Sequence, residues 1–156
     1  MSRAPSHALT TNGRISDELK SRGGPEEEIH RRVRLLDGSE RYSLSLWALP
    51  AATPFDKVDL SAWPQNYIQA AGSADRMVIE VRIAKDGIAR QYAIGHKTAS
   101  DVNQSNVVRE VVVWNDHNSA VSSNEVFAAS EAADIFVLYY KDGDVSTSYS
   151  LRLLSI

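Results

Sequence analysis

The sequence predicts a single α+β domain in which two helices pack on a mainly antiparallel sheet of five to six strands. Apolar and polar residues alternate in several stretches, among them residues 41–49 and 77–94, with the period of a half-buried strand. Residues 62–71 and 130–142 instead carry apolar side chains at helical spacing. With 156 residues, 43% of them hydrophobic, the chain is long enough for one domain with a substantial core.

The N-terminal segment is expected to be a disordered tail over residues 1–25, followed by the folded domain over residues 26–156. The tail is rich in Ser, Gly, Pro and Arg and has few large apolar side chains to bury. It has no apolar stretch of the kind that signal peptides carry. No run in the chain approaches the ~20 apolar residues of a membrane helix. We therefore expect neither a secretory signal nor membrane binding, and the lack of Cys fits a cytoplasmic protein.

Residues 29–36 carry apolar side chains at spacings that fit one face of a helix and also the alternation of a strand. The dipeptide Asp37-Gly38 between two apolar stretches is a strong hairpin signal. Residues 41–49 then alternate with the period of a strand. We predict a β-hairpin formed by residues 29–36 and 41–49.

A short amphipathic helix is predicted over residues 62–71. Ser61 is placed to cap it, Pro64 would lie in its first turn, and Gly72 stands where a helix commonly stops. Trp47 interrupts a Ser-rich strand face, and it is either an exposed interface anchor or a side chain covered by this helix. The covered position is the favoured alternative.

The central part of the chain predicts a second hairpin, with strands at 77–85 and 88–95 and a turn at Asp86-Gly87, since both turn residues tolerate positive φ. Residues 96–106 are polar and should form a loop. Residues 107–114 have apolar side chains on both sides of the alternation, which predicts a central strand covered on both faces. Residues 116–119 should form a further turn.

The C-terminal part predicts a helix that begins after Ser130 as N-cap and ends at Gly143 in the left-handed conformation. A closing strand over residues 145–153 follows it. The tripeptide Lys-Asp-Gly occurs at 85–87 and again at 141–143, first in a hairpin turn and then at a helix end. It is therefore not an internal repeat.

No motif for catalysis or for a cofactor stands out. The four histidines have no metal-ligand spacing, and the absence of Cys excludes disulfides, thiolate metal sites and Cys nucleophiles. His117 beside Asp116 could be a base with its orienting carboxylate, but neighbours in a turn are far more often solvated polar groups. We expect no metal, no cofactor and no enzymatic activity.

Charge is distributed unevenly along the chain. Residues 1–36 carry seven Lys and Arg against five Asp and Glu, whereas residues 37–156 carry ten against fifteen, a net charge of −5. An acidic body argues against binding to nucleic acid, which needs a basic surface. It permits steering toward a basic protein partner, and simple solubility explains it equally well.

Three stretches carry a resemblance to a known family. They are MVIEVRIAKDGIARQYAIG (77–95), SSNEVFAASEAADIFVLYYKDGDV (122–145) and YSLRLL (149–154), and the span from the first to the last covers about half of the chain. This order resembles the deaminase-associated immunity proteins of bacterial polymorphic-toxin systems, which have a hairpin, a late helix rich in Ala and aromatic residues, a TG dipeptide and a short final strand. Asp142-Gly143 stands here in place of the TG, and Tyr149 and Leu151 occupy a last strand that often ends on Trp in the family.

The resemblance implies a non-enzymatic protein that binds a cognate toxin and blocks it. Its surface carboxylates would pair with basic groups that the toxin uses for an anionic substrate. The candidate contacts are Trp47, Asp101, Asp116 and Glu125, chosen because they are expected to be exposed. The alternative is a small enzyme or ligand-binding protein with a cleft between the sheet and helix 62–71, with Tyr92 or His96 at its rim. A structural subunit of a homo-oligomer is a third possibility.

Overall fold

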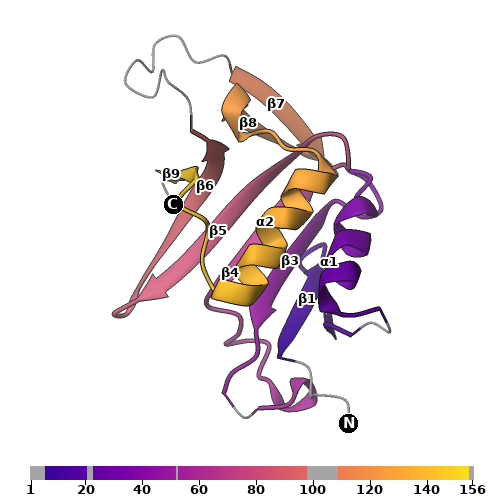
Figure 1. Ribbon diagram of the computed structural model, residues 1–156, viewed down its shortest axis with the longest axis vertical. Helices are drawn as coiled ribbons and strands as arrows, with labels where there is room; N and C mark the ends of the chain where they lie inside the picture. The colour runs from indigo at the N-terminus through magenta and orange to yellow at the C-terminus, as the bar shows by residue number, and fades with distance from the viewer. Residues whose placement is uncertain (1–5, 21–22, 52, 98–108, 155–156) are drawn as a thin grey trace.

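The computed structural model describes residues 6–20, 23–51, 53–97 and 109–154, and it shows one α+β domain in which two helices cover one face of an antiparallel sheet (Figure 1). The strands follow the order β2-β1-β3-β4-β5-β6-β9 across the sheet. The fold class is therefore confirmed, but the sheet has seven strands rather than five to six. Its strands are β1 (His7–Thr11), β2 (Ile15–Glu18), β3 (Ser43–Ala48), β4 (Tyr67–Gly72), β5 (Met77–Lys85), β6 (Ile88–His96) and β9 (Tyr149–Leu153).

The N-terminal segment forms a hairpin rather than a disordered tail. β1 pairs on one side with β2 and on the other with β3, so this segment completes one edge of the sheet. Asn12 and Gly13 make its turn at positive φ, and the Asn12 side-chain oxygen accepts the backbone N–H of Tyr42 at 2.8 Å. Leu9 is fully buried. Ala8 and Leu19 are buried as well. These side chains and the ladder to β3 order a polar segment whose composition alone predicted disorder. Residues 1–5 lie outside the described residues.

The first helix, α1 (Pro25–Arg34), occupies most of the stretch that was predicted as the strand 29–36. Ile29 and Val33 are its buried residues, so the helical period was the correct alternative. Pro stands at its N-terminus, Glu fills its first turn and Arg its last, an order that suits the helix dipole. The Asp37-Gly38 turn therefore joins a helix to β3, and not two strands.

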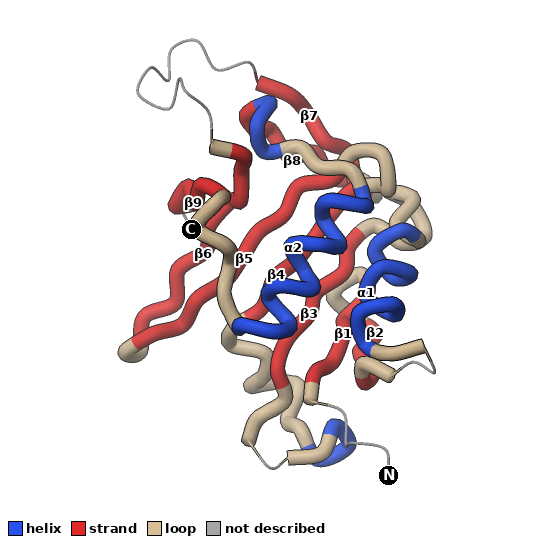
Figure 2. Tube along the Cα trace, in the orientation of Figure 1, coloured by secondary structure: helices blue, strands red, loops and turns tan. Residues whose placement is uncertain are grey.

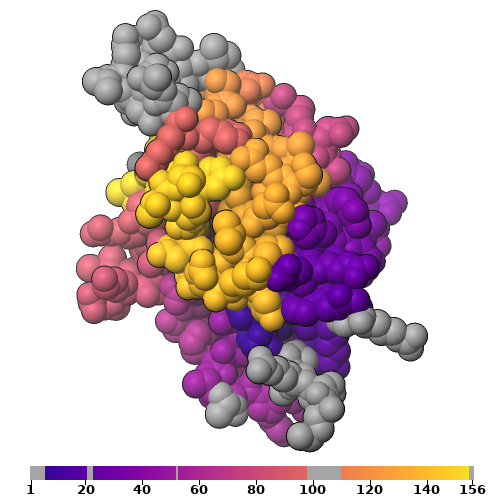
Figure 3. Space-filling view, in the orientation of Figure 1, coloured from indigo at the N-terminus to yellow at the C-terminus, as the bar shows by residue number. Residues whose placement is uncertain are grey.

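The second helix, α2 (Ala129–Asp142), packs beside α1 on the same face of the sheet (Figure 3). It begins two residues earlier than predicted, so Ser130 lies inside the first turn and Ala128 is the N-cap. Gly143 ends it with φ 72°, which confirms the predicted left-handed stop. Neither described helix is long and apolar enough to cross a membrane.

The predicted helix 62–71 is wrong, because residues 67–72 form strand β4 in the middle of the sheet. β4 pairs with β3 and β5. Of the apolar residues that fitted a helical face, Tyr67, Ile68 and Ala71 lie in this strand, whereas Trp63 lies in the connection before it. Gly72 does not end a helix. It is the last residue of β4 and has a φ of 135°. A short 3-10 helix, η1 (Phe55–Lys57), lies in the connection from β3 to β4.

The hairpin of β5 and β6 is confirmed, with Asp86 at φ 54° and Gly87 at φ 77° in its turn. The loop predicted at 96–106 begins one residue later, since His96 ends β6, and residues 98–108 lie outside the described residues. The closing strand predicted at 145–153 is confirmed only over Tyr149–Leu153, which form β9 and pair with β6, whereas residues 145–148 are not strand.

The predicted central strand 107–114 is wrong in its position. β7 (Arg109–Trp114) forms a separate two-stranded hairpin with β8 (His117–Ser122), and its turn is at 115–116 instead of 116–119. Val112 is buried, whereas Val111 and Val113 are more than half exposed. The apolar residues on both faces therefore do not indicate burial on both faces.

The two faces of the main sheet are covered differently (Figure 2). Leu44, Ile79 and the other core residues of one face pack against α1 and α2. On the opposite face, Ala71 and Val78 pack under the β7–β8 hairpin. Residues 49–66 connect β3 to β4, and Phe55 from this connection lies near Trp47. The second face is thus covered in part by a hairpin and in part by an irregular segment.

Candidate functional site

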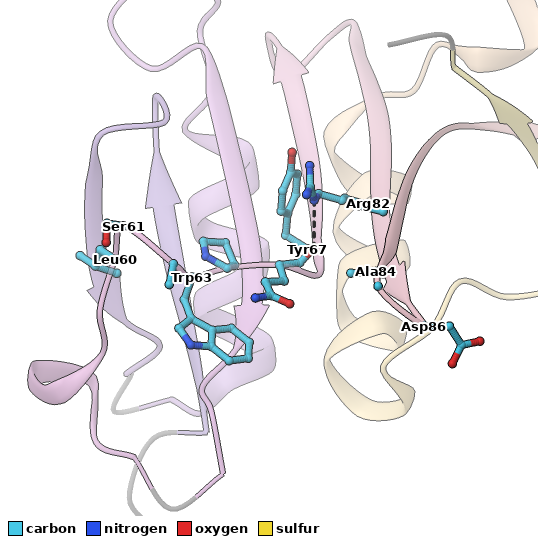
Figure 4. A pocket seen from close by; sticks show the side chains of 12 residues that line it. Leu60, Ser61, Trp63, Tyr67, Arg82, Ala84 and Asp86 are labelled. Carbon is cyan, nitrogen blue, oxygen red and sulfur yellow. Dashed lines mark hydrogen bonds between the residues drawn. The ribbon is translucent and has the colours of Figure 1, made fainter.

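A groove lies on the sheet face opposite the helices, between residues 60–65 and the β5–β6 hairpin (Figure 4). It has a volume of about 770 Å³. Tyr67 and Arg82 are directly opposite each other on β4 and β5, and Ala84 faces Ala89 across β5 and β6. The floor of the groove is therefore the sheet itself, and its wall is the segment that enters β4. The lining residues are Leu60, Ser61, Ala62, Trp63, Pro64, Gln65, Tyr67, Arg82, Ala84, Asp86, Gly87 and Ala89.

The wall is a compact turn built on Asp59. The carboxylate of Asp59 accepts the backbone N–H and the hydroxyl of Ser61 at 3.0 and 2.6 Å, and its backbone carbonyl accepts the N–H of Trp63 at 3.0 Å. The Ser61 bonds hold the pKa of the Asp59 carboxyl below its ordinary value. The Trp63-Pro64 peptide bond is cis. These local bonds place the Trp63 indole beside the groove (Figure 4).

Two hydrogen bonds from β5 attach this wall to the sheet. Arg82 donates its Nε–H to the backbone carbonyl of Gln65 at 3.1 Å, and the backbone N–H of Ala84 donates to the side-chain oxygen of Asn66 at 2.7 Å. One bond comes from the side chain of Arg82, which lies on the groove face of β5, and the other comes from the backbone of Ala84, two residues further along the same strand. The wall is therefore fixed at two points along one strand.

Arg82 and Tyr67 form the centre of the groove. The Arg82 bond uses Nε, and no described residue bonds its two terminal amino groups. Those groups keep their capacity to bind a carboxylate in the bidentate geometry of a guanidinium. Tyr67 is half-buried, and burial raises its pKa, an effect that the Arg82 charge opposes. Tyr67 is therefore a neutral hydroxyl at physiological pH, able both to donate and to accept.

The groove combines a guanidinium with two aromatic side chains, Trp63 and Tyr67. It can stack a planar or apolar group on the rings and can hold a carboxylate or carbonyl oxygen on Arg82. Within the described part of the chain, no group of three or more His, Cys, Asp or Glu side chains is suited to a metal ion. What the groove offers is recognition through hydrogen bonds and aromatic contact.

Comparison with known proteins adds no assignment to this geometry. No protein-family model, no curated protein and no solved structure matches the chain. The resemblance to the immunity proteins consequently stays a prediction, and the function is argued from the groove and its side chains.

Two of the four predicted contact residues are buried, so the exposure on which they were chosen is wrong. Trp47 is fully buried, donates its indole N–H to the Thr10 hydroxyl at 2.9 Å and lies 6.5 Å from the Phe55 ring. The favoured alternative, that Trp47 is covered, is therefore correct. The segment that covers it is the connection that contains Phe55, and not a helix 62–71. Glu125 is 4% exposed and accepts two hydrogen bonds from Arg152, at 2.8 and 2.9 Å.

The other two predicted contacts do not meet in the groove. Asp116 is exposed in the turn of the β7–β8 hairpin, and it does not line the groove. Asp101 lies outside the described residues. The structure therefore does not gather the four predicted residues into one site.

The alternative cleft also differs from its prediction. A groove does exist beside residues 60–65, but Tyr92 and His96 point to the helix-covered face of β6 and do not line it. The Nε2 of His96 lies 2.8 Å from the Glu131 carboxylate, and its Nδ1 lies 3.1 Å from the backbone carbonyl of Asn124. Both partners accept hydrogen bonds, so both bonds form together only when the ring carries two protons.

This His96 cluster joins β6, β9 and α2. Tyr149 on β9 donates its hydroxyl to Glu131 at 2.9 Å. Burial first and then the Glu131 carboxylate raise the pKa of Tyr149 to about 12. Each partner belongs to a different element, and the rings of His96 and Phe127 lie 4.5 Å apart. The cluster therefore attaches β6 and β9, at this edge of the sheet, to α2.

Sequence reasoning missed the central groove residues, Trp63, Tyr67 and Arg82. The predicted amphipathic helix 62–71 placed Trp63 and Tyr67 on its apolar face, and so not in a groove. A signal was present, because Tyr67 and Gln69 alternate with Ile68 and Ala70 in strand period immediately after a Trp-Pro pair. Strand period would have placed Tyr67 on the face opposite Ile68, beside the side chain of a neighbouring strand.

Proposed function

We propose that this protein is a non-catalytic binding protein that neutralises a cognate protein toxin, and that the groove face is the surface presented to the toxin. The observation that carries the proposal is the guanidinium of Arg82, which lines the groove together with Trp63 and Tyr67. Its two terminal amino groups have no hydrogen-bond partner among the described residues. Trp, Tyr and Arg are the side chains that dominate binding energy at protein interfaces. The resemblance of the C-terminal half to immunity proteins supports the same function.

The rigidity of the groove supports binding to a preformed surface. Its floor is three paired strands, and its wall is held by the Asp59 turn and by the bonds of Arg82 and Ala84. A site that is ordered before association loses less conformational entropy when the partner binds. The toxin would place a carboxylate or carbonyl oxygen on Arg82 and an apolar or aromatic side chain against Trp63.

Charge supports a basic toxin surface around that contact. Residues 37–156 carry a net charge of −5, and Asp59 and Asp86 are exposed near the two ends of the groove. Asp116 is exposed at the tip of the β7–β8 hairpin and remains a proposed peripheral contact. Carboxylates at the rim accelerate association with a basic partner more than they add affinity.

The test measures the affinity of this protein for the toxin encoded beside its gene and its ability to restore growth when both are expressed. Arg82→Ala should weaken binding by about 2 kcal/mol or more, roughly thirtyfold in Kd, if Arg82 is an interface anchor. Arg90→Ala is the matched control, because Arg90 is an exposed Arg on the neighbouring strand whose side chain points to the opposite face. It should leave the affinity unchanged.

Equal effects of Arg82→Ala and Arg90→Ala would contradict the groove as the binding surface. A chromosomal neighbourhood without a toxin gene, together with pull-downs that recover no partner, would contradict toxin neutralisation itself. Because Arg82 also bonds Gln65, the unfolding temperature of the variant must be measured beside its affinity.

A second candidate function is binding of a small ligand. The groove volume of about 770 Å³ is in the range of ligand sites, and its guanidinium and aromatic rings suit an anionic planar compound. A screen of aromatic carboxylates by thermal shift discriminates the two functions. A ligand that stabilises the parent but not Arg82→Ala would favour this candidate over toxin binding.

A further inference from the structure

The two edges of the main sheet differ in how they meet solvent. β2, at one edge, has only four residues, and its Asp17 and Glu18 form ion pairs with Arg32 and Lys20. A short edge strand with charges of both signs discourages pairing with another strand. β9, at the other edge, has five residues and presents Leu151 and Leu153, which are 43% and 58% exposed. Arg152 is the one charged residue of this strand, and it is paired with the buried carboxylate of Glu125. The β9 edge therefore lacks the protection that the β2 edge has.

The backbone of β9 directs unused hydrogen-bonding groups away from the sheet. Leu154 donates its N–H to a β6 carbonyl at 2.8 Å, which marks it as a hydrogen-bonded position of the ladder. Such positions alternate in an antiparallel pair, so Ser150 and Arg152 also point their backbone groups to β6. Leu151 and Leu153 then point theirs outward, and no described residue pairs with them.

The side chains of this edge are apolar on one face. Leu151 and Leu153 lie opposite Ile94 and Tyr92 of β6, and Tyr149 continues the same row. Ile94 is fully buried, whereas both Leu side chains are left open at the edge. The apolar layer beneath the helices thus extends to a sheet edge that no described residue covers. An edge with both unpaired backbone groups and an apolar row fits the addition of another strand.

We propose that β9 pairs with β9 of a second copy of this chain, as antiparallel strands related by a twofold axis at Leu151. This pairing places Leu151 opposite its own copy, Leu153 opposite Tyr149, and Ser150 opposite Arg152. The strand is therefore self-complementary, as a closed twofold interface requires. An axis at Arg152 would instead set two like charges opposite each other, which is unfavourable.

Most of the outward backbone groups find partners in this register, and the carbonyl of Leu153 stays with solvent. Leu151 exchanges two N–H to carbonyl bonds with its copy, and the N–H of Leu153 donates to the carbonyl of Tyr149. The N–H of Tyr149 is already used within the chain, by the carbonyl of Ser146 at 3.1 Å, so only its carbonyl is needed at the interface. The dimer would leave the groove open, because the groove is lined by β4, β5 and β6 and not by β9. The proposal is thus independent of toxin binding.

The test is sedimentation of the full chain over a concentration series, with variants at the proposed axis. The parent should approach twice the 17.2 kDa mass of one chain. Leu151→Lys and Leu151→Glu should each remain at the mass of one chain, because each introduced charge meets its own copy. An equimolar mixture of the two variants should regain the double mass, since Lys then faces Glu.

Ile15→Lys is the matched control, a similar change at an exposed position of the β2 edge, and it should leave the mass of the dimer unchanged. Circular dichroism of each variant confirms that it is folded. A parent that stays at the mass of one chain at every concentration would overturn the proposal. So would Leu151 variants that dimerise as the parent does, or a mixture that remains at the mass of one chain.

Discussion

Gly72 and Gly143 allow the packing of the sheet to be tested with one substitution made at two places. Both have positive φ, 135° and 72°, so both are conformations that an L side chain adopts with strain. They differ in space. A Cβ at Gly143 would have no atom within 4 Å, whereas a Cβ at Gly72 would lie 2.3 Å from the Arg76 carbonyl oxygen and 2.8 Å from the Met77 Cα.

The magnitudes follow from that difference. Gly143→Ala carries only the cost of a left-handed backbone, about 1 kcal/mol. Gly72→Ala carries backbone strain of about 1–3 kcal/mol and also a forced movement of the facing strand, which costs about 1–3 kcal/mol more. We expect about 4 kcal/mol in all for Gly72→Ala. For a chain of this size that corresponds to a fall of roughly 10 °C in Tm, against about 2–4 °C for Gly143→Ala.

Urea unfolding at neutral pH measures both, with the protein concentration held constant so that self-association does not enter. A loss for Gly72→Ala no larger than that for Gly143→Ala would refute the close approach of β4 to residues 76–77. Such a result would instead agree with the original prediction that Gly72 ends a helix, because both glycines would then occupy the same kind of position. A Gly143→Ala variant as stable as the parent would refute the left-handed end of α2.

Arg152→Ala should destabilise the protein more than Glu125→Ala, by about 3 against about 1–2 kcal/mol. The first leaves a carboxylate only 5% exposed without its cation, with the Ser122 N–H as its remaining donor, and the second removes that capping bond but leaves an Arg side chain that is 41% exposed and can be hydrated. Urea unfolding of both variants measures the order, and the reverse order would contradict it. Burial lowers the pKa of His7 in the folded protein below its ordinary value of 6.5. The stability contributed by neutral His7 is therefore fully present above pH 6.5, and it is lost as the pH falls through the pKa of His7 in the folded protein. His7→Phe should reduce the loss of stability between pH 7 and pH 5, and an unchanged pH dependence would exclude His7 as its source. Tyr149 should titrate near pH 12 by ultraviolet absorbance, and Glu131→Gln should lower that midpoint because it removes a neighbouring negative charge. An unchanged Tyr149 midpoint in Glu131→Gln would place the hydroxyl away from that carboxylate.

The sequence predicted well where local pattern and turn chemistry agree. The alternation on both sides of Asp86-Gly87 gave the β5–β6 hairpin, since only a turn with positive φ at both residues closes it tightly. The apolar spacing before Gly143 likewise gave α2 and its end. In each case the backbone conformation is determined by residues close in the chain.

The sequence misled where two periods fit the same residues. Residues 62–71 fit a helix, but β4 fills the place between β3 and β5, and its ladder to two strands outweighs a helical preference over so short a segment. Residues 7–18 are too polar to predict a strand, yet they pair with the edge that β3 offers. Both outcomes depend on partners far away in the chain, which a local pattern does not contain.

The candidate site shows the same division. The residue types were visible, but exposure was inferred from polarity, and this failed for Glu125, which is buried against Arg152 from the last strand. The groove residues Tyr67 and Arg82 come from strands whose pairing sets them opposite each other. Their contact is a property of register and not of composition.

The sequence alone determined the fold class, the β5–β6 hairpin with its turn, the end of α2 at Gly143 and the acidic charge of residues 37–156. These depend on propensity, on period and on the freedom of Gly at positive φ. Only the tertiary structure decided that residues 67–72 are a strand, that Trp47 is covered and that Arg82 faces an open groove. Burial and strand pairing are settled by segments distant in the chain, because a side chain is covered or left open only once the whole sheet is assembled.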